Sequence, residues 1–283
     1  MADTRSCIDC SNDFSTSAER CPHCGRPGLF PNVHAAEQSG DRDALSKRYD
    51  SAVSEATARG AERSLHSFEA ALASSQAVIA RSATDLFRLA TSDNEIYGTY
   101  YSLLGAGLRL PLGTKWDIVR GVVDSALFPN YKEQVRFAAL SLDGVGLSSY
   151  GEFSIGLRAD MIAHRATVFH ENSILFMKHQ RIRIAEADSL PKGYRAVWSE
   201  RGKLCVAKLS PRIDDSTHPQ EYSALLLQQG VTSEEDEFVE VHIWGPMTIR
   251  TIEQVTLTNP RLVKRVTIKA IKAKLMKVKV RIK

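Results

Sequence analysis

The stretch FVEVHIWGP, from Phe238 to Pro246, alternates between two sets of side chains in the way that a β-strand does. The alternation puts three aliphatic residues on one face and the acid Glu240 on the other, among aromatic residues. A carboxylate flanked by aromatic side chains is an unusual choice for a face that only meets water. The stretch therefore predicts a sheet in this part of the chain, and it makes Glu240 the first candidate for a functional residue.

Further strands are predicted around this one, mostly in the second half of the chain. Short apolar or alternating runs mark them at residues 77–81, 135–142, 150–157, 166–169, 173–177, 193–200, 202–210 and 253–257. Helical patterns come mainly earlier, at residues 35–73, 82–90 and 96–131. Such segregation predicts an α+β domain with a largely antiparallel or mixed sheet. Cys205 falls in the run 202–210 and is expected to be a buried strand residue, not a nucleophile.

Four of the five cysteines form two C-x-x-C pairs near the start of the chain, separated by ten residues. Thiolates at this spacing are typical of a tetrahedral zinc site, since each pair delivers two ligands from one tight turn. About 30 residues cannot bury a sufficient core, so metal ligation would contribute most of their folding free energy. We predict a zinc ribbon over residues 1–32 that holds a closed, structural Zn²⁺ site with the ligands Cys7, Cys10, Cys21 and Cys24.

The rest of the chain divides by composition into three parts. Residues 33–73 are rich in Ala, Glu, Ser and Arg and predict a polar helical linker. Residues 74–260 contain the predicted sheet. Residues 261–283 carry ten Lys or Arg and no acid, although the whole chain of 283 residues has a net charge of only +4. This basic tail predicts either attraction to a polyanion or a solvated terminal segment.

Composition and motifs exclude several classes of protein. No apolar run approaches the roughly 20 residues of a membrane span, and the first residues lack the features of a signal peptide, so a cytoplasmic location is expected. The segment GVGLSSYG (144–151) is not a dinucleotide-binding G-x-G-x-x-G, because a strand and not a helix follows it. The chain has no P-loop and no H-E-x-x-H zinc motif.

One family resemblance remains after these exclusions. The run YGEFSIGLRADMIAHRATVFHENSILF (150–176), followed later by FVEVHIWGPMTI (238–249), resembles bacterial ADP-ribosyltransferases, including toxin-like members. The resemblance covers about residues 74–257 and implies a split mixed or antiparallel sheet that binds NAD as a substrate. In that superfamily an Arg or His on the first strand holds NAD, a Ser- or Tyr-containing segment shapes the nicotinamide pocket, and one Glu opens a late strand.

Carried onto this sequence, the resemblance assigns Glu240 as the catalytic residue. It assigns NAD binding to Arg81, at the end of the first predicted strand, and to Ser148, Ser149 and Tyr150 of LSSYG. The choice of arginine stays open, because four others are rivals: Arg109, Arg120, Arg136 and Arg158. Cleavage of the bond to nicotinamide builds positive charge on the ribose, and a single carboxylate can stabilise that charge and help to deprotonate the acceptor.

The acceptor is expected to be nucleic acid, RNA or DNA. Arginine-modifying members of the superfamily usually carry a second Glu two residues before the catalytic one, where this chain has Phe238, which could stack on a base. The resemblance implies a toxin or defence effector, and hence a neutralising protein partner such as an antitoxin. Two alternatives stay open: a zinc-ribbon nucleic-acid-binding module with an inert domain, and a protein-modifying transferase. No membrane partner is expected.

Overall fold

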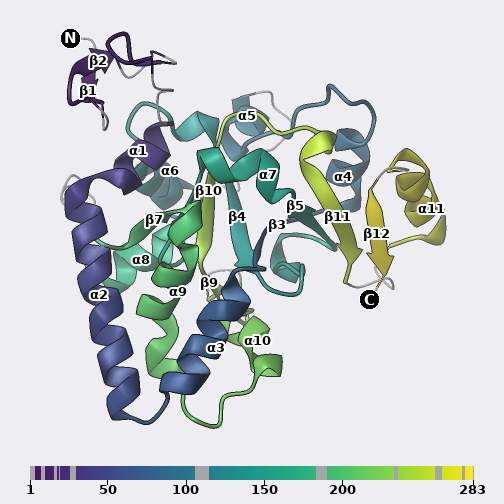
Figure 1. Cartoon of the computed structure of the whole chain (residues 1–283). Coiled ribbons are helices and arrows are strands. Elements are labelled where there is room, and N and C mark those ends of the chain that lie inside the picture. The colour runs from purple at the N-terminus through teal and green to yellow at the C-terminus, as the bar shows by residue number, and fades with distance from the viewer. Residues whose placement is uncertain are drawn as a thin grey trace.

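The computed structural model describes residues 4–7, 10–15, 18, 20–25, 30–105, 115–182, 190–232, 235–258, 263–275 and 278–282. Within them the chain has an α+β architecture, with a small N-terminal cysteine-containing unit, then helices, then a large sheet with interspersed helices (Figure 1). The N-terminal unit contains an antiparallel pair of short strands, β1 (Thr4–Ser6) and β2 (Asp13–Ser15). The predicted fold class is confirmed.

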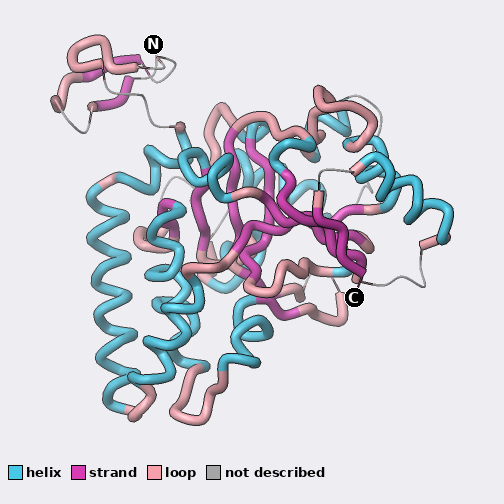
Figure 2. Tube along the Cα trace, turned by 45° about the vertical axis from the view of Figure 1, so that its right-hand side comes forward, coloured by secondary structure: helices cyan, strands magenta, loops and turns pink. Residues whose placement is uncertain are grey.

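The main sheet has the strand order β12-β11-β5-β3-β4-β10-β6-β7. Figure 2 shows the strands in magenta, with helices around them. Seven strands pair antiparallel, and β12 joins the edge parallel to β11. The bounds of the strands are β3 (Gln76–Arg81), β4 (Val135–Ser141), β5 (Phe153–Leu157), β6 (Ala166–Phe169), β7 (Arg195–Val197), β10 (Glu240–Trp244), β11 (Ile252–Leu257) and β12 (Lys279–Ile282). A separate short pair joins β8 (Leu227–Gln228) to β9 (Glu237–Phe238).

Helices cover both faces of this sheet. The remaining bounds are α1 (Pro31–Glu37), α2 (Ser39–Ala58), α3 (Glu62–Leu72), α4 (Ala83–Leu89), α5 (Tyr100–Gly105), α6 (Lys115–Leu127), α7 (Ala159–Ile162), α8 (Ser173–His179), α9 (Arg201–Leu209), α10 (Tyr222–Leu226) and α11 (Arg265–Lys274). Val241 and Ile243 of β10 share the main hydrophobic core with residues of α2, α3, α4 and α9. A second core, on the other side of β10, contains residues of α6 and α8.

The helices predicted over residues 35–73 are present as α2 and α3, together with α1 before them. They are more than a connection, because Leu45, Leu65 and Phe68 are buried in the same core as the sheet. Ser82 caps α4, since its hydroxyl accepts a hydrogen bond from the backbone N–H of Asp85.

Two predicted strands were wrong. Residues 173–177 form α8 and residues 202–210 lie mainly in α9, so Cys205 is fully buried in a helix. Asn172 starts α8 because its side-chain oxygen accepts hydrogen bonds from the N–H groups of Ile174 and Leu175. A short apolar run is compatible with a buried helix as well as with a strand. For residues 173–177 the cap at Asn172 favours the helix.

The basic tail is folded where the structure describes it. Residues 265–274 form α11 and residues 279–282 form β12, the edge strand of the sheet. Residues 261, 262, 276, 277 and 283 of the predicted tail lie outside the described residues, as does Arg109. Among the described helices, none has both the length and the apolar composition needed to cross a bilayer.

Candidate functional site

Glu240 lies at the start of the central strand β10, between Ala139 of β4 and Phe169 of β6. Its side chain is only 2% exposed, so it is not an ordinary surface charge. It does not face an open surface either, because α6 and α8 pack against this side of the sheet. A buried carboxylate costs free energy unless hydrogen bonds or opposite charges compensate for lost hydration, so its partners determine what it can do.

Two hydrogen bonds hold the carboxylate of Glu240. Its Oε2 accepts from the backbone N–H of Ser173, at the first turn of α8, at 3.0 Å. The same oxygen lies 3.1 Å from Nε2 of His242, two residues along β10. Burial alone would raise the pKa of Glu240, but His242, Arg120 and the Ser173 N–H together hold it below its ordinary value. Glu240 is therefore a buried, ionised group.

His242 is positioned by aromatic rings. Its ring lies 4.7 Å from that of Phe128 and 5.5 Å from that of Phe137, both edge-on, and 5.6 Å from that of Phe169. Because an ionised carboxylate only accepts hydrogen bonds, His242 donates its Nε2 proton to Glu240. The aromatic residues around Glu240 thus fix the orientation of its partner.

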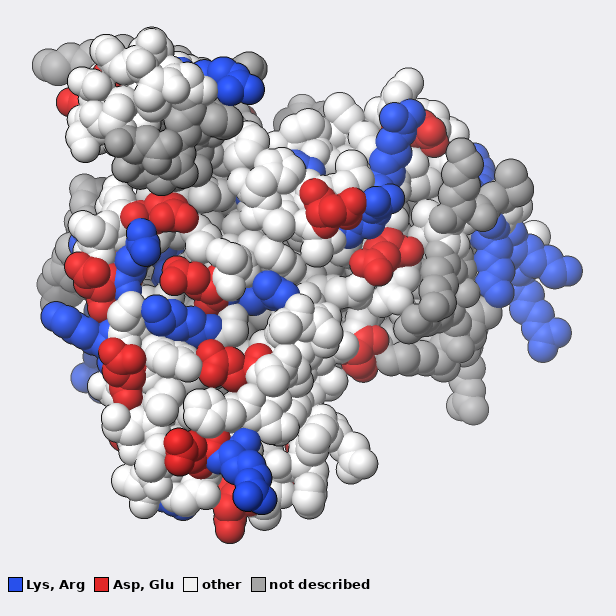
Figure 3. Space-filling view, in the orientation of Figure 1, with Lys and Arg blue, Asp and Glu red and all other residues white. Residues whose placement is uncertain are grey.

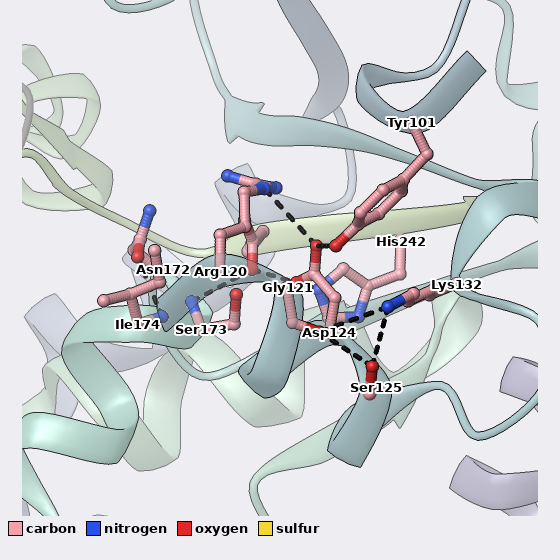
Figure 4. A network of polar contacts seen from close by, with 11 residues as sticks. Tyr101, Arg120, Gly121, Asp124, Ser125, Lys132, Asn172, Ser173, Ile174 and His242 are labelled. Carbon is pink, nitrogen blue, oxygen red and sulfur yellow. Dashed lines mark hydrogen bonds and ion pairs between the residues drawn. The ribbon is translucent and has the colours of Figure 1, made fainter. Parts of the chain in front are cut away.

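Arg120 and Asp124 of α6 form the other half of the cluster (Figure 4). Nε of Arg120 lies 3.4 Å from Oδ2 of Asp124, and the hydroxyl of Tyr101 donates to the same oxygen at 2.7 Å. The guanidinium also stacks 4.3 Å from the ring centroid of Phe137. Burial would lower the pKa of Arg120, but Asp124, Glu240 and Tyr150 raise it overall. Arg120 therefore stays cationic between the two acids.

The pKa values of the two carboxylates of this cluster are shifted in opposite directions. Asp124 is fully buried, and burial raises its pKa although Arg120 and Tyr101 act in the opposite direction. The charge of Glu240 raises the pKa of Asp124 further. Glu240, with its lowered pKa, is suited to stabilise positive charge. Asp124, with its raised pKa, is suited to donate a proton, and Arg120 lies beside both acids.

The predicted LSSYG residues lie on the Glu240 side of the sheet. They form a 3₁₀ turn, Ser148–Tyr150, fixed because Ser148 Oγ donates to Gln229 Oε1 at 2.7 Å and Ser149 Oγ donates to Asp236. Gly151 ends the turn at φ 143°, and a side chain there would collide with the backbone of Arg81. The turn is thereby held against the end of β3.

Tyr150 connects this turn to the cluster. The residue as a whole is 39% exposed, but burial around its hydroxyl and the nearby Asp236 raise its pKa to about 12 against the lowering effect of Arg120. Glu240 also raises the pKa of Tyr150. The structure therefore brings Glu240 and Tyr150 together, around Arg120.

Arg81 is not part of this cluster. Ala139 of β4 pairs with Glu240 on one side and with Val78 of β3 on the other, so Val78 is the residue of β3 in line with Glu240. Arg81, three residues further along β3, points to the opposite face. Its guanidinium stacks 4.9 Å from the ring centroid of Tyr97. Of the rival arginines in the described residues, Arg120 is the one beside Glu240. Phe238 is only 5% exposed and packs with Ala139 and Leu147, so it presents no stacking surface.

Sequence reasoning missed His242, Asp124 and Ser173. Two of them carried a signal: His242 shares a strand face with Glu240, and Asp124 follows Arg120 by one helical turn, where ion pairs form. Ser173 acts through its backbone N–H, which any residue provides, so no side-chain pattern could have identified it.

The four N-terminal cysteines lie together. Their sulfur atoms are all within 4.8 Å of one another, with Cys7–Cys24 at 3.5 Å and Cys10–Cys21 at 3.6 Å. Four sulfurs bound to one Zn²⁺ at about 2.3 Å in a tetrahedron would lie about 3.8 Å apart, so the set fits a zinc ion. Gly25 follows the second pair at φ 73°, as the turn requires, and His23 is exposed.

No protein-family model matches this chain, and no curated protein is significantly similar to it in sequence. What the chain itself establishes is a four-cysteine cluster able to hold a metal and an α+β domain with an antiparallel sheet.

We expect purified protein to hold about one Zn²⁺ per chain with sulfur-only ligands, measured by metal analysis and X-ray absorption. Cys21→Ser should unfold the N-terminal unit and leave the melting of the sheet domain largely unchanged, because the cysteine cluster and the main sheet have separate cores. Cys205→Ser is the control, and it should destabilise the sheet domain without loss of zinc. Nitrogen or oxygen ligands, or a folded N-terminal unit without metal, would contradict this prediction.

Proposed function

We propose that the protein is an NAD-dependent mono-ADP-ribosyltransferase in which Glu240 is the catalytic residue. The observation that carries this proposal is a carboxylate kept ionised on the central strand, beside a fixed arginine and away from water. In such surroundings a charge stabilises a developing opposite charge far better than it does in bulk water. The resemblance of the chain to ADP-ribosyltransferases points to the same residue.

In the proposed reaction the bond between C1′ of the ribose and the nicotinamide nitrogen breaks, and nicotinamide leaves with the electron pair. A nucleophilic oxygen or nitrogen of the acceptor then bonds to C1′ and releases its proton. Glu240 stabilises the positive charge on the ribose, and Arg120 supplies a cation for the ribose or the phosphates. Tyr150 lines the nicotinamide side. Because α6 and α8 cover Glu240, the substrate reaches it only when this cover moves.

The assignment of Arg120 follows from its position. It contacts Asp124, stacks on Phe137 and is close enough to Glu240 for each charge to shift the pKa of the other. Arg81, on the opposite face, has none of these relations among the described residues. We therefore propose Arg120 as the arginine that holds NAD.

Nucleic acid is the acceptor that we propose, and the helix α11 favours it. Lys264, Arg265, Lys269 and Lys272 are exposed and form no ion pair with an acid in the described part of the chain. Arg265, Lys269 and Lys272 recur at helical spacing and share one face over about 10 Å. Figure 3 shows the resulting concentration of basic side chains at the side of the molecule where α11 lies.

The N-terminal cysteine unit and α11 also support the second candidate, a nucleic-acid-binding module with an inert domain. Incubation with labelled NAD and separate pools of RNA, DNA and protein separates the candidates: label transfer defines an enzyme and its acceptor, whereas nucleic-acid binding without transfer defines a module. A toxin or defence role in the cytoplasm, with a neutralising protein partner, remains a proposal that rests on the resemblance.

Glu240→Gln should reduce transfer by about 10² to 10³-fold, because it keeps the shape but removes the charge that stabilises the transition state. NAD affinity should be nearly unchanged in this variant. Arg120→Gln should weaken NAD binding itself. Turnover, NAD affinity by calorimetry and melting temperature are to be measured for each variant.

Asp41→Asn is the matched control for Glu240→Gln. Asp41 is another buried carboxylate, at the edge strand β7, where its Oδ1 accepts a hydrogen bond from the N–H of Gly193 at 3.1 Å and lies 3.8 Å from Nε of Arg195. Its replacement should alter stability and leave the turnover of the folded protein unchanged. A folded Glu240→Gln protein with full activity would refute the proposed mechanism.

Replacing Arg265, Lys269 and Lys272 of α11 by Gln should weaken binding to a single-stranded 30-nucleotide RNA or DNA. The slope of log affinity against log salt concentration should become shallower by about 2, since each lost phosphate contact lowers it by about 0.7. The control variant carries the same loss of charge on exposed residues of α2 and α3: Arg42→Gln, Lys47→Gln and Arg63→Gln. Binding is measured by fluorescence anisotropy over a salt series. Equal losses in the two variants would show that overall charge, not α11, attracts the nucleic acid.

A further inference from the structure

Three arginines lie at one end of the strands, and two of them, Arg81 and Arg136, are on the face of the sheet opposite Glu240. Arg136 of β4 pairs with Ile243 of β10, whose neighbour on β6 is Ala166. Arg165 comes directly before Ala166, and its charge acts on Arg136. Arg81 is the last residue of β3. Val78 of β3 pairs with Ala139 of β4, and the same register continued along both strands places Arg81 opposite Arg136, on the same face.

Arg136 and Arg165 both bind the corner where β10 ends. Arg136 Nη1 donates to the carbonyl of Gln134 at 2.8 Å, and that carbonyl also accepts from the N–H of Gly245 at 3.0 Å. Arg165 Nη1 donates to the carbonyls of Trp244 and of Pro246, the latter at 2.9 Å. All these partners are neutral, so none of them compensates the charge of either guanidinium.

These two arginines are buried without an anion. Each is only 9% exposed, and neither forms an ion pair with an acidic group in the described residues. Nε of Arg136 is buried and has no hydrogen-bond partner. Burial together with the like charge of Arg165 lowers the pKa of Arg136 to about 10, and burial lowers that of Arg165. Buried charges in proteins normally have a counterion, so two adjacent unmatched guanidiniums require an explanation.

Tyr97 and Arg81 complete the cluster. The N–H of Tyr97 donates to the carbonyl of Met247 at 2.7 Å, just after the same corner, and Arg81 stacks on the tyrosine ring. A small hollow lies beside them and is lined by Arg81, Arg88 and Gly98. Asp85 also lines it, but this acid lies 3.9 Å from Arg88 and accepts from Ser82, so Arg81 gains no ion pair from it.

We propose that Arg81, Arg136 and Arg165 form a binding site for a phosphate-type anion, such as the phosphoryl group of a phosphorylated metabolite. Neighbouring guanidiniums suit a multiply charged oxyanion, because each presents a planar fork of N–H donors that matches phosphate oxygens. Arg81 and Arg136 place the site on the opposite face of the sheet from Glu240. It is therefore distinct from the proposed transferase centre, and it does not depend on that function.

The probe is inorganic pyrophosphate, added to the full-length protein at constant ionic strength, with melting temperature and calorimetry as readouts. At about a hundredfold excess over Kd, the wild type should melt about 5 °C higher or more. Arg136→Met should abolish this rise. Without pyrophosphate the same variant should melt no lower than the wild type, because it removes one of two buried like charges.

Two further variants make the test decisive. Arg81→Gln changes a half-buried residue with little effect on folding, and it should weaken pyrophosphate binding at least tenfold. Arg201→Met is the control, since this arginine also donates to neutral carbonyls, those of Ala73 and Trp198, and lies elsewhere. It should lower the melting temperature and keep the full pyrophosphate effect.

The proposal is overturned if pyrophosphate does not stabilise the wild type, or if Arg136→Met keeps the stabilisation. If saturating NAD displaces pyrophosphate, the claim that this is a separate site is also overturned, because the arginines would then belong to the NAD site. Glu240→Gln should bind pyrophosphate like the wild type, so a failure of the transferase proposal remains distinguishable from a failure of this one.

Discussion

The charge of Glu240 inside the central strand is the constraint on which the rest of this side of the molecule depends. A strand between β4 and β6 that is covered on both faces would ordinarily carry only apolar side chains. An ionised acid is tolerated there because His242, the N–H of Ser173 and Arg120 converge on it. The packing of α8 and α6 against this face is thus fixed by polar contacts as well as by apolar contacts.

The charged side chains on the two faces of the sheet differ in whether they have partners of opposite charge. On the Glu240 face, each carboxylate has partners within hydrogen-bond or ion-pair distance: Arg120 and Tyr101 for Asp124, and His242 and the Ser173 N–H for Glu240. On the opposite face, Arg136, like its neighbour Arg165, has only carbonyl partners in the described residues. A matched cluster can be pre-organised for chemistry, whereas an unmatched one has capacity for a ligand of opposite charge. This difference is why we propose a transferase centre on one face and an anion site on the other.

Most strands of the sheet could be predicted from the sequence, because alternation and β-branched residues mark β3, β4, β5, β6, β10 and β11. The four-cysteine cluster could also be predicted from the sequence, since the geometry of metal ligation sets the spacing of its cysteines. The failures have physical reasons. The short runs in α8 and α9 are apolar in either conformation, and a side-chain cap at Asn172 decides the first of them. The arginine beside Glu240 depends on how α6 packs over β10, which no local pattern encodes.

The claim that Glu240 is ionised in the folded protein is tested most directly by comparing the stability of the wild type and Glu240→Gln from pH 3 to pH 8 by urea denaturation. A carboxyl group whose pKa is lowered on folding contributes stability above its unfolded pKa, about 4.3, and this contribution is lost as the pH falls through the folded pKa. We expect the stability of the wild type relative to Glu240→Gln to fall steadily below about pH 4.3. A relative stability that rises on acidification would contradict it, because Glu240 would then be protonated in the native state.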